Sequence, residues 1–308
     1  QLASAAPSKR APTSSRRGGC QTRFGPESAA DAASPSNPQT ATTACPVYAN
    51  QTVEIPVYTY IPYYDTKTLA NNYFTTTQLM KGINDLNKHY GQYKPRIKFT
   101  LKTPKYKRIT DDDIWDELHY LEPADEEDID YLNEMVTIPA RGQLSTRGST
   151  QMRQLWLYLL PGIGTQGTLG YSFVPQSKTP FLHDGVFLDA SRWLEDQATV
   201  AHEVGHWLRL LHTFEGGCKG TDFVSDTPPW QDTSNAESIS CKGSPGYSYN
   251  DIVNPCKGSK SDAIKNIKNI MSYSDDHCQI EFTFGQRKRF WDAATNYRLF
   301  KPVCGPVK

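Results

Sequence analysis

Alternating apolar positions and one helical run define the elements that the first half of the chain predicts. Residues 53–61 alternate apolar with other side chains, which predicts a strand, and Pro56 favours an edge position or the outer face of that strand. Residues 75–89 place apolar side chains at helical spacing behind a threonine-rich N-cap region, which predicts a helix. Residues 96–101 predict a second strand, and the wholly apolar run 155–160 predicts a buried central strand.

The first 45 residues have a different composition, rich in Ser, Ala, Pro and Thr and without sustained periodicity. We expect 1–45 to be a leader or pro-segment, largely disordered by itself, followed by one folded domain over 46–308. The dibasic pairs Lys9-Arg10 and Arg16-Arg17 would suit a processing protease on an extended leader; the alternative is a solvated basic tail. Because no apolar signal core precedes this leader, we expect a form whose export signal has been removed.

An acidic segment over 111–134 interrupts its carboxylates with Ile, Trp, Leu and Tyr. Calcium binding is one interpretation, and a solvated helical face is the other. The EF-hand spacing with its central glycine is absent from the segment, which favours the solvated face.

Charge and hydropathy exclude two classes of partner. The 33 basic and 33 acidic residues give a formal net charge of zero, so we expect neither nucleic acid nor an anionic membrane as a partner. The sequence has no run of about 18 apolar residues, so we expect no ordinary transmembrane helix.

Cysteine placement points to an oxidising compartment. Two of the seven cysteines, Cys20 and Cys45, lie near the start, and five lie in the last third. This clustering predicts disulfides that link a loop-rich C-terminal region, and therefore a secreted, extracellular protein. A sequon at Asn50 agrees with secretion and predicts a glycoprotein. The five later cysteines are Cys218, Cys241, Cys256, Cys278 and Cys304.

The candidate chemistry lies in the helical pattern around residues 201–208. At 3.6 residues per turn, His202 and His206 share one face, and the apolar residues cluster on the opposite face. Two imidazoles four residues apart on a helix suit two ligands of one zinc ion. Glu203 lies about a quarter-turn from His202, near the metal without coordinating it, where a general base is required.

A third histidine makes this pattern more specific. His212 follows His206 by six residues and completes the longer zinc signature of metzincins. We therefore expect His202, His206 and His212 to hold Zn²⁺ as the cofactor, with Glu203 as the catalytic base.

Further segments resemble one group of metzincins. Residues 269–273, Asn-Ile-Met-Ser-Tyr, resemble the metzincin Met-turn, and 281–286 resemble the helix entry that follows it. The strings 202–208 and 212–218 are similar to those of the pappalysin group, especially its small secreted fungal members. Segments 169–171 and 226–228 look like further family segments, so the resemblance is specific from about residue 165 to 290.

This resemblance implies an α/β (mixed α+β) fold, the zincin-like metzincin domain with two lobes. The upper lobe, 46–212, would have a twisted mixed sheet and two long helices, and the lobe would end at the zinc helix. The lower lobe, 213–308, would be irregular, disulfide-linked and closed by a helix over about 285–297. Substrate would pair with an edge strand near 166–173.

The resemblance also implies the activity and the roles of two more residues. The chain would be a secreted zinc-dependent endopeptidase, a monomer that hydrolyses internal bonds of protein or peptide substrates with zinc-activated water. Met271 would form the hydrophobic base under the zinc site without being a ligand. Tyr273 would be catalytic by steadying the oxyanion; a purely structural tyrosine is the alternative.

One position departs from the family pattern. Metzincins usually have Gly three residues after the second histidine, where the helix ends in a left-handed conformation, and this chain has Arg209 there. A continued helix would carry His212 about 9 Å along the axis from His206, so a break near 209 is needed. A residue with a Cβ adopts that conformation at about 1–2 kcal/mol. The alternative function is therefore a secreted pseudopeptidase that binds a partner through the cleft.

The family pattern further implies two disulfides, Cys218–Cys256 and Cys241–Cys278. Cys20 loosely resembles a pro-segment thiolate that blocks zinc in a zymogen; an ordinary disulfide to one of the other remaining cysteines is the alternative. Family members also suggest Ca²⁺ near the loop after the third histidine, with Asp222, Asp226 and Thr227 as oxygen donors. A capping and turn role is the alternative for these three residues.

Overall fold

The structure is a computed structural model, and part of the 308-residue chain is described by it. It describes residues 50–65, 74–119, 131, 133–137, 140, 150–163, 168–175, 184–195, 197–231, 256–275 and 278–304. The proposed leader over 1–45, including Cys20, lies outside the described residues, as do Cys45 and Cys241.

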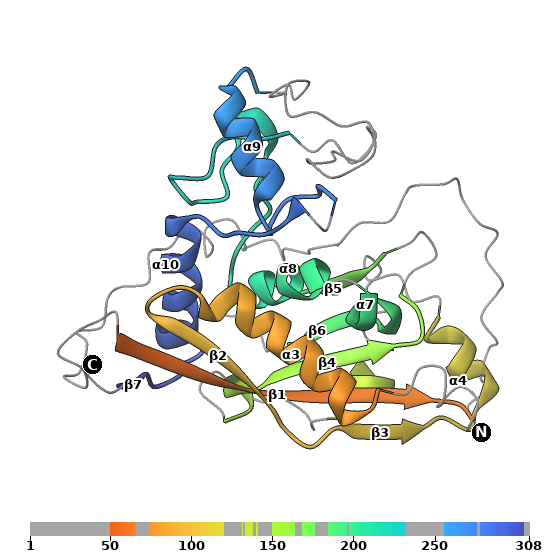
Figure 1. The fold of residues 1–308 in the computed structure, drawn as a ribbon. Coiled ribbons are helices and arrows are strands. Elements are labelled where there is room, and N and C mark those ends of the chain that lie inside the picture. Colours follow the sequence, from red (N-terminus) through yellow and green to blue (C-terminus); the bar gives the residue numbers. More distant parts are fainter. Residues whose placement is uncertain are drawn as a thin grey trace, which may run out of the picture.

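A mixed sheet forms the base of the fold (Figure 1). Its main path runs β2-β1-β4-β6-β5, with β3 and β7 also paired to β1. Most pairs are parallel, whereas β5 with β6 and β7 with β1 are antiparallel, which confirms the mixed sheet. The strands are β1 Gln51–Tyr63, β2 Arg96–Leu101, β3 Lys105–Arg108, β4 Leu155–Leu160, β5 Gly170–Ser172, β6 Val186–Asp189 and β7 Val303–Cys304.

The strand predictions are confirmed, but the edge position predicted from Pro56 is wrong. Strand β1 pairs with β2 and β3 along one edge and with β4 and β7 along the other. The Val57 carbonyl accepts from Lys102 on the β2 side, so the neighbouring Pro56 nitrogen faces the opposite edge. Pairing with β4 begins only at Val57, so the missing N–H of Pro56 disrupts no pair in that register.

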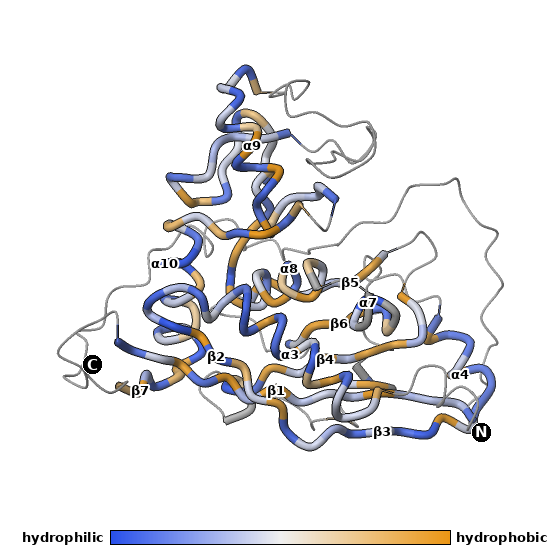
Figure 2. The backbone as a smooth tube through the Cα atoms, in the orientation of Figure 1, coloured by the Kyte–Doolittle hydropathy of each residue, from blue (hydrophilic) through white to orange (hydrophobic). Residues whose placement is uncertain are grey.

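Two helices cover one face of this sheet (Figure 1). Helix α3, Thr76–Gly91, begins behind Thr75, whose side chain forms a capping box with Gln78, and buries its apolar stripe. Helix α8, Gln197–Trp207, lies beside α3 and is buried from Ala198 to Trp207. Figure 2 shows hydrophobic residues along β4 and β6, and the core of the domain lies between these strands and the two helices.

The described helices in the last third of the chain lie outside the sheet (Figure 1). Helix α9, Lys260–Lys268, lies away from the sheet, and α10, Phe284–Asp292, continues as the π-helix η7, Ala293–Tyr297. These two segments confirm the closing helix expected over about 285–297. The remaining helices are α4 Asp112–Glu117, α7 Ala190–Glu195, η2 Asn133–Thr137, η3 Thr150–Arg153 and η4 Gly217–Lys219.

The acidic segment forms a helix where it is described. Asp111 caps α4 by accepting from the Ile114 N–H, and the carboxylates of its first turn face solvent. This part of the segment therefore supports the solvated helical face. None of the helices in the described part of the chain is long and apolar enough to cross a membrane.

A buried ion pair ties the C-terminal turn to the centre of the domain. The Arg298 guanidinium donates to both Asp184 carboxylate oxygens, at 2.7 and 3.1 Å, and both side chains are almost fully buried. Arg298 also donates to the Trp207 carbonyl and stacks on the indole of Trp207, 3.4 Å from the ring centroid. This pair therefore holds the end of α8.

We expect Asp184→Asn to lower the free energy of unfolding by about 3–5 kcal/mol, because Arg298 would remain buried without its counter-charge. Urea unfolding followed by circular dichroism measures the change. The matched control is Glu54→Gln, which removes an exposed ion pair with Lys98 at 3.0 Å and should cost at most about 1 kcal/mol. Equal small losses in both variants would contradict this assignment.

Candidate metal centre

Helix α8 carries two of the predicted ligands on a rigid support. His202 and His206 are buried, and Val200, Val204 and Trp207 on the other side of the helix belong to the main core. The Tyr90 hydroxyl of α3 donates to the Ala201 carbonyl at 2.7 Å, immediately before His202. The packing of α8 therefore fixes where both imidazoles lie, before any metal binds.

The helix ends at a left-handed Arg209, as the position of His212 requires. Arg209 has φ 67°, the Leu210 N–H donates to Gly205 at 2.9 Å, and the Arg209 N–H donates to His206 at 2.8 Å. These two bonds are those of a Schellman motif, which satisfies the last carbonyls of a helix. The chain then turns back and brings His212 to the other two histidines.

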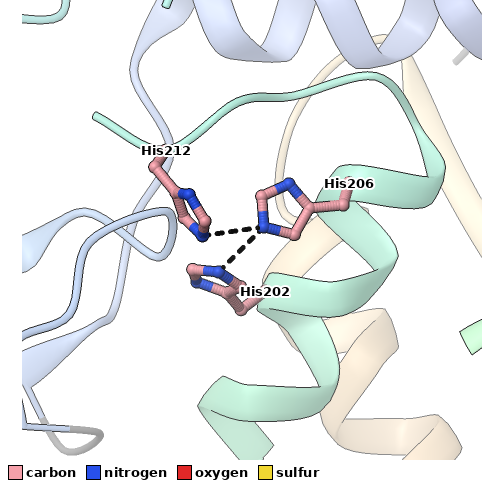
Figure 3. Close-up of side chains that lie close together, drawn as sticks. All are labelled: His202, His206 and His212. Carbon is pink, nitrogen blue, oxygen red and sulfur yellow. Dashed lines mark hydrogen bonds between the residues drawn. The ribbon is translucent and has the colours of Figure 1, made fainter. Parts of the chain in front are cut away.

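The three imidazoles converge through their Nε2 atoms (Figure 3). His206 Nε2 lies 3.0 Å from His202 Nε2 and 3.1 Å from His212 Nε2. A tetrahedral zinc ion with Zn–N bonds of about 2.0–2.1 Å holds its nitrogens about 3.3 Å apart. The spacing of the three nitrogens therefore approaches the spacing that one metal ion requires.

Backbone carbonyls determine which ring nitrogen carries the proton. His202 Nδ1 lies 2.7 Å from the Ile270 carbonyl, and His206 Nδ1 lies 2.8 Å from the Leu210 carbonyl. A carbonyl only accepts, so each Nδ1 carries the hydrogen and each Nε2 of a neutral ring presents a lone pair.

Burial keeps these rings neutral. The pKa values of His206 and His212 lie well below the usual value, first because of burial and then because of the neighbouring imidazoles. Lone pairs that face each other at 3.0 Å repel unless a cation lies between them. The donor set and its protonation therefore fit a metal ion.

Glu203 lies buried beside this centre, against the edge of the sheet. A Cβ added to Gly170 would lie 3.1 Å from the Glu203 Cγ and 2.9 Å from a Leu188 methyl group. Glycine at 170 therefore allows strand β5 to approach the carboxylate-bearing side chain closely. Strand β5 ends the main path of the sheet. It therefore corresponds to the edge strand expected near 166–173.

The Met-turn lies directly under α8. Met271 is fully buried, and a Cβ added to Gly205 would lie 2.4 Å from its sulfur. The Met271 carbonyl accepts from the Thr213 N–H at 3.1 Å, which joins the turn to the residue after His212. Ile270, one residue earlier, supplies the carbonyl for His202. The turn thus contacts the segments that carry the predicted ligands.

A buried amide pair fastens this turn to the closing helix. Asn269 and Gln286 exchange two hydrogen bonds, at 2.8 and 3.0 Å, and the Asn269 oxygen also accepts from the Met271 N–H. Gln286 simultaneously accepts from the Thr283 N–H in the capping box of α10. Sequence reasoning missed this pair, although the capping pattern at 283–286 signals one of its members.

Tyr273 lies in an aromatic group with His212. Its ring centroid is 4.8 Å from that of His212 and 4.6 Å from that of Phe214. Phe214 itself stacks on His212, with ring centroids 4.6 Å apart and planes 11° from parallel. These contacts establish a packing role for Tyr273 and reveal Phe214, which sequence reasoning did not single out as a site residue.

One predicted disulfide is confirmed. Cys218 and Cys256 are joined across 38 residues, with Cα atoms 5.1 Å apart. Cys278 and Cys304 are also disulfide-bonded, but Cys241, the partner implied for Cys278, lies outside the described residues.

The proposed calcium donors serve as caps and turns. Asp226 accepts from the Thr283 hydroxyl at 2.7 Å and the Gly285 N–H at 2.8 Å, at the start of α10. Asp222 accepts from the Val224 N–H, and its burial raises its pKa to about 7. Within the described part of the chain, the group of His, Cys, Asp or Glu placed to hold a metal is His202, His206 and His212. The Ca²⁺ expectation is thus unsupported.

Four features of this structure together define a metzincin-type metalloprotease domain. They are the mixed sheet, the helix with two buried histidines, the left-handed turn to a third histidine and the methionine turn beneath them. The family model Peptidase_M43, described as pregnancy-associated plasma protein-A, matches residues 164–294, which include all of this centre. An extracellular metalloprotease of Neurospora crassa is 30% identical over 266 residues, 81% of this chain and 78% of the relative. The chain belongs to this pappalysin family of metalloproteases.

Two further similarities agree with this membership. An extracellular metalloprotease of Verticillium alfalfae is 37% identical over 147 residues, 44% of this chain and 47% of that relative, so the match spans about half its length. Mature mirolysin of Tannerella forsythia, solved with a cleaved peptide, matches with a TM-score of 0.56 at 22% identity. The match covers 80% of this chain and 94% of mirolysin, which establishes the fold.

We expect Gly205→Ala to weaken metal binding by about tenfold, because its new methyl group would displace Met271 or the helix turn between His202 and His206. Titration with zinc in competition with a chromogenic chelator measures the affinity. Gly91→Ala at the end of α3 is the matched control, since its Cβ would meet ordinary contact at 3.5 Å. Equal affinity in both variants would show that the Met271 contact does not constrain the centre.

Proposed function

We propose that the chain is a secreted zinc-dependent endopeptidase. The observation that carries the proposal is the convergence of three buried Nε2 atoms, two of them with their lone pairs fixed by backbone carbonyls. Membership of a metalloprotease family supports the class of reaction. His202, His206 and His212 would hold the zinc ion.

A bound zinc ion would supply Lewis acidity, which polarises the scissile carbonyl and makes water a stronger acid. Glu203 then accepts a proton from the attacking water and delivers it to the leaving amine. Its buried position next to His202 in α8 suits this role, since a carboxylate shielded from bulk water keeps the proton within the site. Tyr273, next to His212, steadies the developing oxyanion.

Protein or peptide substrates would bind along strand β5. This strand, Gly170–Ser172, has β6 on one side as its antiparallel partner and ends the main path of the sheet. A substrate in extended conformation would add a strand there by main-chain pairing and so pass beside Glu203. The chain would act as a monomer without nucleic acid or membrane partners.

Catalysis is favoured over the pseudopeptidase alternative. That alternative was motivated by Arg209, whose Cβ disfavours the left-handed turn. Arg209 nevertheless has φ 67°, and His212 lies 3.1 Å from His206. The departure from glycine thus leaves the three-histidine centre assembled.

The disulfides and the names of the relatives support secretion. The Cys218–Cys256 disulfide and the further bonded Cys278 and Cys304 suit an oxidising compartment, and the fungal relatives are named extracellular. We propose a glycan at Asn50, a zymogen leader over 1–45 and a catalytic domain over 46–308, divided near residue 212 into upper and lower lobes.

Glu203→Gln should retain one zinc ion per chain and lower kcat by at least about a hundredfold, because the base is lost while the ligands remain. Hydrolysis of an unfolded protein, with zinc content from elemental analysis, tests both parts. Glu281→Gln, at an exposed carboxylate, is the matched control and should retain full turnover. Near-normal turnover of Glu203→Gln would refute its role as the base.

Removal of zinc by a chelator should abolish hydrolysis, and added zinc should restore it where added calcium does not, because the ligand set consists of nitrogens.

His212→Ala should lower zinc affinity by about a hundredfold or more, since one of three ligands is lost. Chelator competition measures the affinity. Unchanged zinc affinity in His212→Ala would exclude His212 as a ligand.

A further inference from the structure

Arg209 occupies a position where a side chain is costly. Its φ of 67° lies in the left-handed region, which is unfavourable for a residue with a Cβ and which glycine adopts freely. The turn at this position decides whether His212 reaches the other histidines. An arginine without compensating contacts would weaken this turn. The contacts of its side chain therefore show whether Arg209 strengthens the turn.

The Arg209 side chain packs on the C-terminal helical unit. Its guanidinium carbon lies 4.6 Å from the ring centroid of Tyr297, which is buried. A guanidinium cation over the face of an aromatic ring is attracted by the ring, and more strongly where water is excluded. Burial raises the pKa of Asp292, and the charge of Arg209 is one of the neighbouring influences that oppose this rise.

The Arg209 backbone is held by the same unit. Arg289 of α10 donates from its Nε to the Arg209 carbonyl at 2.8 Å. Burial and the neighbouring charge of Arg209 lower the pKa of Arg289 to about 10, and the Asp222 and Asp292 carboxylates partly oppose this shift. Both the carbonyl and the side chain of Arg209 are therefore fixed by residues about 80 to 90 positions later in the sequence.

The π-helical end of this unit places Tyr297. Residues Ala293–Tyr297 continue α10 with the wider turn, and the Arg298 N–H donates back five residues to Ala293 at 2.8 Å. Arg298 then donates to the Trp207 carbonyl, two residues before Arg209. Two consecutive side chains of the π-helical end thus contact the end of α8 and the turn that follows it.

We propose that Arg209 is a positioning residue, which holds the left-handed turn against Tyr297 and thereby keeps His212 at the zinc site. This inference rests on the zinc-binding function proposed above. Glycine would adopt the turn without strain but would leave it attached only through its backbone. Arg209 therefore compensates its backbone cost with contacts that glycine cannot make, and it couples the third ligand to the C-terminal helix.

The test compares the rate at which the zinc-loaded full chain loses zinc to excess chelator. Arg209→Gly should lose zinc about tenfold faster, although it relieves the backbone strain. Tyr297→Leu, which keeps an apolar side chain but removes the aromatic face, should show a similar increase. In the double variant the second substitution should raise the rate of zinc loss by less than about threefold, because both substitutions remove the same contact between Arg209 and Tyr297.

A second readout separates positioning from general stability. Cobalt in place of zinc reports the ligand geometry through its visible absorption. Arg209→Gly should shift that spectrum, and the spectrum of Arg209→Lys should lie closer to that of the wild type. Lys301→Gly, which exchanges an exposed cation for glycine near the C-terminus, is the matched control and should change neither zinc loss nor the spectrum.

Three outcomes decide the inference. Zinc loss from Arg209→Gly that is equal to or slower than wild type overturns it, and so do additive effects of Arg209→Gly and Tyr297→Leu. If Arg209→Gly leaves the cobalt spectrum unshifted and lowers the melting temperature of the zinc-free chain, Arg209 contributes to stability alone. This outcome also overturns the inference. A wild-type chain that holds no zinc refutes the proposed function instead, whereas tight wild-type binding with an unchanged glycine variant refutes only the positioning role of Arg209.

Discussion

The geometry of the centre depends on where helix α8 stops. At 1.5 Å per residue, a helix that continued past Trp207 would carry His212 about 9 Å beyond His206, too far to share one metal ion. The chain instead reverses at a single left-handed residue, Arg209, with both Schellman hydrogen bonds in place. The positions of the third histidine, of the loop after it and of the aromatic group around it all follow from that reversal.

This reversal is secured by residues far away in the sequence. Arg298, through its ion pair with Asp184 and its stacking on Trp207, fixes the last turn of the helix from below. Arg289 binds the carbonyl of the left-handed residue itself. The site therefore depends on the C-terminal helical unit as much as on α8, and the long-range contacts explain why a residue with a Cβ is compatible with the turn.

Electrostatics prepare the centre for a cation before one arrives. The Ile270 and Leu210 carbonyls hold hydrogens on the outer nitrogens of His202 and His206, so the inner nitrogens present lone pairs. Burial opposes protonation of the rings, which would otherwise relieve the repulsion between those lone pairs. The inner lone pairs repel one another without a metal ion and attract a metal ion when it binds. The segments that supply the Ile270 and Leu210 carbonyls therefore contribute to metal affinity.

The sequence by itself determined several of the elements and predicted that three histidines come together, because these features depend on local periodicity and spacing. Alternation predicted β1, helical spacing predicted α3, and three histidines with a required break near Arg209 predicted the metal ligands. Only the tertiary structure decided that Pro56 lies in an interior strand. It also decided which carbonyls orient the imidazoles, and that the buried charge of Arg298 meets Asp184 114 residues away. Such contacts arise when distant segments pack, and no local pattern encodes which segments meet.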